Sequence, residues 1–104
     1  MSLVLTYITN PTEEAAKKLA KHLLEKKLIA CANIFPIHSM YWWKEEIADE
    51  QEFVVLAKTT DEMYDPVKAE VEKIHSYEVP CVIKINADAN NSYLNWLEGE
   101  VKKQ

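Results

Sequence analysis

The chain has 104 residues, enough for one domain (residues 1–104) with a single hydrophobic core of modest size. Its 17 acidic and 12 basic side chains give a formal net charge of -5, which argues against nucleic acid as a partner because phosphate binding needs a basic surface. No signal-peptide pattern is present, and no apolar run approaches the roughly 20 residues that cross a bilayer. We therefore expect a cytoplasmic protein with no membrane partner, in which Cys31 and Cys81 are thiols.

The first predicted elements are a strand and a helix. An apolar run with β-branched residues over 3–9 is typical of a strand. Asn10, Pro11 and Glu13 follow in a pattern that indicates a helix start, with Asn10 as the cap and Glu13 completing a capping box. Apolar residues then recur at helical spacing as far as Leu28, so the sequence predicts the first helix here.

A long antiparallel hairpin is predicted next. Residues 29–43 favour an extended segment interrupted near Pro36, and residues 52–59 favour a second strand. Only a polar connection separates the two, so we expect them to pair with each other.

The last third of the chain predicts a helix, a strand and a terminal helix. Pro66 is tolerated only in a first turn, so the second helix is expected to begin at Asp65 or Pro66. Residues 79–87 favour a fourth strand, with Pro80 near its start or on an edge. Apolar positions over 93–101 predict a terminal helix of about three turns.

The order of these elements indicates a ferredoxin-like, split βαβ fold of the α+β class, in which two helices cover one face of a four-stranded antiparallel sheet. The opposite face is left bare. Tyr41, Trp42 and Trp43 are consecutive, and adjacent strand residues point to opposite faces, so one face cannot hide both indoles. Because extended apolar surfaces mark interaction sites, we expect an oligomer in which sheets pack on one another.

Five motifs also occur in the order found in one known family. They are Ala30-Cys31-Ala32-Asn33-Ile34, Tyr41-Trp42-Trp43-Lys44, Leu56-Ala57-Lys58-Thr59, His75-Ser76-Tyr77-Glu78-Val79-Pro80 and Tyr93-Leu94-Asn95-Trp96-Leu97. With them the chain resembles the CutA family, the divalent-cation tolerance proteins, over essentially its whole length. The resemblance implies a tight homotrimer similar to PII signal-transduction proteins, and tolerance to copper and other divalent metals. The chain departs from the family pattern at Ser76, where proline is usual, and at Glu45 and Glu46, which stand in place of a glycine-containing turn.

Cys31 and His75 are the candidate metal ligands, because thiolate and imidazole suit copper and zinc. By the resemblance, Cys31 matches the family's cysteine before the long strand, and His75 matches the histidine of its His-Pro-Tyr-Glu-Val-Pro signature. The competing interpretations are a small buried hydrophobe for Cys31 and a helix cap or pocket wall for His75. For three other residues we expect structural roles: His22 on the surface, His38 solvated beside a bend, and Cys81 in the core.

A cleft between subunits is predicted from a second set of residues, with Lys58 and Glu78 as an ion pair or a structural salt bridge. The set comprises Tyr41, Trp43, Lys58, Tyr77 and Glu78. No catalytic arrangement stands out, so we expect no enzymatic activity. Two functions stay open. One is the binding of divalent or transition-metal ions, copper first, in metal tolerance. The other is a PII-like signalling or scaffold module that binds a small anionic metabolite or a protein partner in the cleft.

Overall fold

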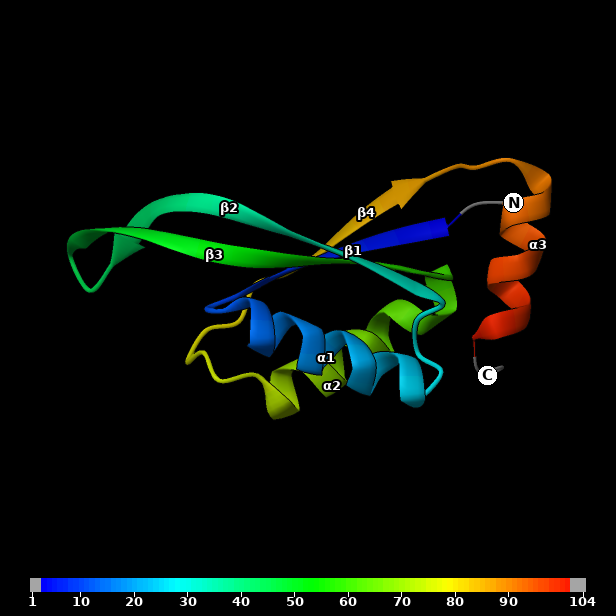
Figure 1. Cartoon of the computed structure of the whole chain (residues 1–104), viewed down its shortest axis with the longest axis horizontal. Helices are drawn as coiled ribbons and strands as arrows, with labels where there is room; N and C mark the ends of the chain where they lie inside the picture. Colours follow the sequence, from blue (N-terminus) through cyan, green and yellow to red (C-terminus); the bar gives the residue numbers. More distant parts are fainter. Residues whose placement is uncertain (1–2, 102–104) are drawn as a thin grey trace.

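The computed structural model describes residues 3–101, so the predicted domain (1–104) extends beyond the described residues at both ends. The elements are β1 (Leu3–Asn10), α1 (Glu13–Glu25), β2 (Cys31–Trp43), β3 (Glu46–Thr59), the 3₁₀ turn η1 (Asp61–Met63), α2 (Tyr64–Ile74), β4 (Val82–Ala87) and α3 (Asn91–Glu100). The strands form one antiparallel sheet in the order β2-β3-β1-β4. Helices α1 and α2 lie side by side below this sheet, whereas α3 stands at one end of it (Figure 1). The predicted ferredoxin-like fold is confirmed.

The core lies between the sheet and helices α1 and α2. Both helices present an apolar stripe to the strands, as their helical spacing predicts. The buried side chains include Ala16, Leu19, Ala20 and Leu23 of α1, Val67 and Val71 of α2, and Ile8, Val55 and Ala57 of the sheet. Burying a side chain of the Val, Leu or Ile type contributes about 1.5–3 kcal/mol, so this layer is the main source of stability.

Helix α1 begins later than the sequence predicts. Thr12 is its N-cap, and the Thr12 hydroxyl accepts a hydrogen bond from the Ala15 N–H at 3.0 Å. Asn10 instead ends β1, and its side-chain amide donates to the carbonyl oxygens of Ile8 and Phe53, each at 3.2 Å. The predicted Asn10 cap is therefore wrong, because the amide is already bonded to the sheet.

Strands β2 and β3 continue beyond the rest of the sheet as a two-stranded arm. Strand β1 ends opposite Phe53, whereas β2 and β3 pair for seven further positions, from Ile37 opposite Glu52 to Trp43 opposite Glu46. At about 3.4 Å per residue the arm is about 24 Å long. It accounts for the elongated shape of the subunit, whose extents are 45 × 24 × 21 Å (Figure 1).

Two details of this hairpin differ from the prediction. Strand β2 is continuous through Pro36, which pairs with Phe53. A proline is tolerated here because β2 is an edge strand, so its missing N–H can point away from β3. The connection is also shorter than expected, since only Lys44 and Glu45 separate the strands, at φ values of 49° and 67°. Such left-handed values suit a tight two-residue hairpin turn.

The fourth strand is shorter than predicted, and the two remaining helices are close to their predicted positions. Strand β4 begins at Val82, so Pro80 lies outside it. Pro66 lies in the first turn of α2, as proline geometry requires. Within residues 3–101 we find no helix with the length and apolar character needed to cross a bilayer.

The sheet face opposite α1 and α2, which we call the open face, is only partly covered. At one end it packs against α3, through a cluster built on Leu3, Leu94 and Leu97. Elsewhere it carries large apolar side chains with substantial exposure, such as Ile83 at 48% and Ile85 at 42%. The predicted bare apolar surface is therefore present in the single chain.

Candidate functional site

The two predicted metal ligands lie toward opposite ends of the sheet. Cys31 begins β2, opposite Lys58 in the β2–β3 ladder. His75 follows α2, and its Nε2 bonds to the carbonyl oxygen of Thr9 at 2.8 Å. On β1, the partner of Lys58 is Leu5, and four residues of strand, about 13 Å, separate Leu5 from Thr9. One chain does not bring Cys31 and His75 together, so a shared metal site stays a prediction about neighbouring subunits.

Both ring nitrogens of His75 already have hydrogen-bond partners. The backbone N–H of Tyr77 donates to Nδ1 at 3.0 Å, so Nδ1 is the unprotonated nitrogen. Nε2 therefore carries the proton that is donated to the Thr9 carbonyl oxygen. Both ring nitrogens of His75 are thus occupied, and a metal ion would have to displace one of these two hydrogen bonds.

Several polar groups near His75 lie around a buried carboxylate, that of Glu52 on β3. Glu52 is only 4% exposed, and its Oε2 accepts a hydrogen bond from the Tyr77 hydroxyl at 2.6 Å. Burial and this carboxylate raise the pKa of Tyr77 far above the ordinary tyrosine value, since both penalise the phenolate. Burial and Glu52 also raise the pKa of the Cys81 thiol, partly offset by a hydrogen bond with Thr9. Together Thr9, Glu52, Tyr77 and Cys81 form what we call the Glu52 cluster.

The arm extends this cluster outward through Tyr41. Strand alternation places Tyr41 and Trp43 on the same face of the arm as Glu52. Partial desolvation, followed by the nearby Glu50 and Glu52 carboxylates, raises the pKa of Tyr41. The ammonium of Lys44 lies 5.6 Å from the centroid of a Trp43 ring, a cation–π contact at the arm's tip. Three predicted cleft residues, Tyr41, Trp43 and Tyr77, therefore lie in this half of the open face.

Lys58 lies at the other end of the same face. Its Nζ is 5.6 Å from the centroid of the Tyr93 ring on α3. Glu78 is exposed in the loop before β4, and no ion pair joins it to Lys58 among residues 3–101. A Lys58–Glu78 pair therefore stays a prediction about contacts between subunits.

Glu52 is the functional candidate that sequence reasoning missed. With 17 acidic residues in the chain, one more carboxylate carries no signal of its own. Strand periodicity offers a signal, because Glu52 alternates in phase with Val54 and Leu56 and so falls on the open face among apolar side chains. A carboxylate in such a position needs a partner, which Tyr77 supplies.

The two other histidines bond to acidic side chains. His22 is half-buried and bonds through Nε2 to Oε2 of Glu70 at 2.5 Å, linking α1 to α2, so the expectation of a plain surface residue is wrong. His38 is exposed, as expected, and bonds to Asp49 across the arm. Both cysteines are free and half-buried. Residues 3–101 contain no group of three or more His, Cys, Asp or Glu side chains placed to hold a metal ion.

Known proteins of one family match this sequence and fold. Residues 4–100 match the family described as CutA1 divalent ion tolerance protein. The divalent-cation tolerance protein CutA of Archaeoglobus fulgidus is 43% identical over 97 residues, which cover 92% of this chain and 95% of that protein. The protein of the same name from Thermotoga maritima is 41% identical over 100 residues, covering 95% of this chain and 99% of that protein.

The solved structures agree. The crystal structure of CutA1 from Pyrococcus horikoshii has a TM-score of 0.93 at 37% identity, covering 96% of this chain and 99% of that chain. The Archaeoglobus fulgidus structure, described as a periplasmic divalent cation tolerance protein, has a TM-score of 0.92 at 42% identity, again covering 96% and 99%. Identity at this level over nearly complete chains shows common descent as well as a common fold. This chain belongs to the CutA1 divalent ion tolerance protein family.

Proposed function

We propose that this chain serves divalent-metal tolerance by binding a soft transition metal, copper first, in a cleft between the subunits of a homotrimer. The observation that carries this proposal is the position of Cys31, a free, half-buried thiol that shares the open face with Lys58. Thiolate sulfur is a preferred ligand of copper and zinc. Because one chain holds no complete ligand set among residues 3–101, a neighbouring subunit supplies the rest, with His75 as the first candidate.

The proposal is tested by titrating Cu²⁺ and Zn²⁺ into the protein by calorimetry. We expect binding tighter than about 1 mM, which corresponds to about 4 kcal/mol. Cys31→Ser and His75→Gln should each weaken it about tenfold or more, since each removes one ligand. The matched control is Cys81→Ser, which removes the other thiol and should leave binding unchanged. Equal affinity in the Cys31→Ser variant would exclude the proposed site.

Assembly is tested separately. A subunit of 12.0 kDa should sediment as a trimer of three times that mass. Ile85→Lys places a charge on the exposed apolar part of the open face, so it should shift the protein toward smaller species. A wild-type monomer at micromolar concentration would contradict the trimer. We place the protein in the cytoplasm, although the Archaeoglobus fulgidus relative is described as periplasmic.

The second candidate function is the binding of a small anion in the same cleft, with no catalysis. Two observations favour it: the lone pair of His75 is occupied, and Lys58 makes no ion pair among the described residues. Inorganic phosphate and citrate are suitable probes. If Lys58→Met abolishes their binding while neither metal ion binds the wild type, this function replaces metal binding.

A further inference from the structure

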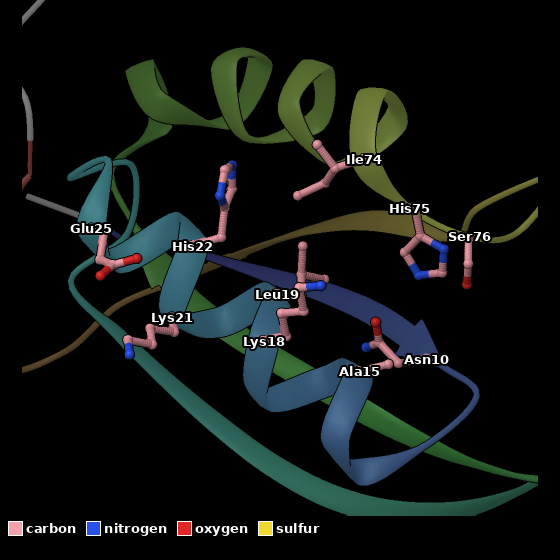
Figure 2. Close-up of a pocket in the computed structure, with 10 residues that line it drawn as sticks. All are labelled: Asn10, Ala15, Lys18, Leu19, Lys21, His22, Glu25, Ile74, His75 and Ser76. Atoms are coloured by element: carbon pink, nitrogen blue, oxygen red, sulfur yellow. The ribbon is translucent and has the colours of Figure 1, made fainter.

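A groove of about 600 Å³ lies on the helix side of the molecule, away from the open face (Figure 2). It follows α1 from Ala15 to Glu25, about 15 Å at 1.5 Å per residue. The end of α2, at Ile74 and His75, forms the facing wall. Its volume falls in the range of sites that bind small organic molecules. Of its lining residues, only His75 has a part in the proposed metal function.

The groove has an apolar lining that suits a hydrocarbon group. Ala15 and Leu19 of α1 and Ile74 of α2 line it. Ile74 is 42% exposed, which is unusual for the apolar stripe of a packed helix. A ligand with an aliphatic body would cover this surface and gain free energy from its burial.

The charge around the groove favours an anion. Lys18 and Lys21 line it, and neither makes an ion pair with any residue in the described range 3–101. Glu25 opposes them at one end, so these three side chains carry one net positive charge. His22 also lines the groove, but its Nε2 is already bonded to Glu70.

Asn10 presents a hydrogen-bond acceptor to the groove at the opposite end. It is only 2% exposed, and its amide nitrogen donates to two backbone carbonyl oxygens, those of Ile8 and Phe53. Because a carbonyl only accepts, these contacts fix the orientation of the amide. Oδ1 is left without a donor among residues 3–101, and Figure 2 shows it pointing toward the groove between α1 and His75.

We propose that this groove binds a small aliphatic hydroxycarboxylate. The carboxylate lies near Lys18, the hydrocarbon body covers Leu19 and Ile74, and the hydroxyl donates to Oδ1 of Asn10. A hydroxyl fits better than an ammonium because the groove already carries net positive charge. The inference rests on this geometry alone and is independent of metal binding at Cys31.

The probe is 2-hydroxy-4-methylpentanoate, titrated into the isotope-labelled full chain and followed by backbone amide NMR. We expect saturable shifts centred on Ala15, Leu19 and Ile74, with a Kd of a few mM, on the order of 3 kcal/mol. The same acid without its hydroxyl, 4-methylpentanoate, should bind about threefold to tenfold more weakly, because it cannot donate a hydrogen bond to Oδ1 of Asn10.

Two variants test the assignment with little risk to folding. The variant Lys18→Gln should weaken binding about tenfold, because it removes the cation that faces the carboxylate. Its control is Lys17→Gln, a substitution of an exposed lysine that does not line the groove and pairs with Glu13; it should leave binding unchanged. Ala15→Leu should block the Asn10 end and abolish binding at an unchanged thermal midpoint.

Three results would overturn the inference. The first is the absence of saturable shifts up to about 50 mM probe, a concentration at which even a very weak site fills. The second is equal affinity for 4-methylpentanoate, which would leave Asn10 without a role. The third is an equal loss in Lys17→Gln, which would show that the anion responds to overall charge and not to the groove.

Discussion

Removing one hydroxyl group, by Tyr77→Phe, tests whether the Glu52 cluster stabilises the fold. The Tyr77 hydroxyl donates to Glu52 at 2.6 Å, and Glu52 is 4% exposed. A hydrogen bond to a charged group contributes about 1.5–3 kcal/mol, and the carboxylate would lose it without gaining water. We therefore expect a loss of about 1.5–3 kcal/mol. At an m-value of about 1–3 kcal/mol/M, the urea midpoint should fall by roughly 1 M.

The assay is urea unfolding at a fixed protomer concentration, because association shifts apparent stability. Tyr93→Phe is the matched control, since the Tyr93 hydroxyl makes no hydrogen bond to residues 3–101. The same Tyr77→Phe change in a Glu52→Gln background should cost only about 0.5–1.5 kcal/mol, the range for a neutral pair. If both tyrosine variants shift the midpoint equally, or if the background makes no difference, the carboxylate is not the relevant partner.

The Tyr77–Glu52 pair also predicts that the stability of the fold depends on pH in the alkaline range. The raised pKa of Tyr77 means that folding favours its neutral form. That contribution is fully present below the unfolded pKa of about 10 and is lost as the pH rises from there toward the raised folded value. Wild type should therefore lose stability above about pH 10 more steeply than Tyr77→Phe. Parallel alkaline slopes for the two proteins would contradict this.

Three further predictions concern the helix layer. Leu23→Ala, at a fully buried position, should cost about 2–5 kcal/mol in urea unfolding, whereas the half-exposed Leu24→Ala should cost much less. Thr12→Ala should cost about 1 kcal/mol by the same measurement, because the α1 cap is lost. The hydrogen bond from His22 lowers the pKa of Glu70, so its contribution is present above about pH 4.5 and is lost as the pH falls below that value. The difference in thermal midpoint between wild type and Glu70→Gln should accordingly shrink from pH 6 to pH 3.

Local patterns predict the elements of this fold because each helix and strand is built on its own periodicity. Where a prediction from the sequence is wrong, the local structure depends on a contact with a residue far away in the sequence. Asn10 is a residue type that often caps helices, yet its side-chain amide donates a hydrogen bond to the backbone carbonyl oxygen of Phe53 on the neighbouring strand. Pro36 is a residue type that usually interrupts a strand, yet it is tolerated because β2 lies at the edge of the sheet. Neither outcome is visible until the strand order is known.

The candidate site is less predictable than the fold for a related reason. The ligand chemistry of Cys31 and His75 is evident from the sequence, but their distance apart depends on the register of β1 and β3. The occupied lone pair of His75 depends on the path of a single loop, which returns the Tyr77 N–H to the ring. To predict Glu52 as a site residue, the alternation of β3 must be combined with the position of that loop. Residue type alone cannot supply such information.

The loop from His75 to Tyr77 connects the groove on the helix side with the open face. The His75 ring lines the groove on the helix side, and its Nδ1 holds the backbone of Tyr77, whose hydroxyl reaches Glu52 on the open face. A metal ion or a proton at Nδ1 would release the Tyr77 N–H, because that nitrogen has one lone pair. The Tyr77 backbone would then no longer be held in the position from which its hydroxyl reaches Glu52. Metal binding at His75 should therefore disturb the Glu52 cluster, whereas metal binding through Cys31 alone should not. The NMR signals of the Tyr77 amide and ring distinguish these two cases.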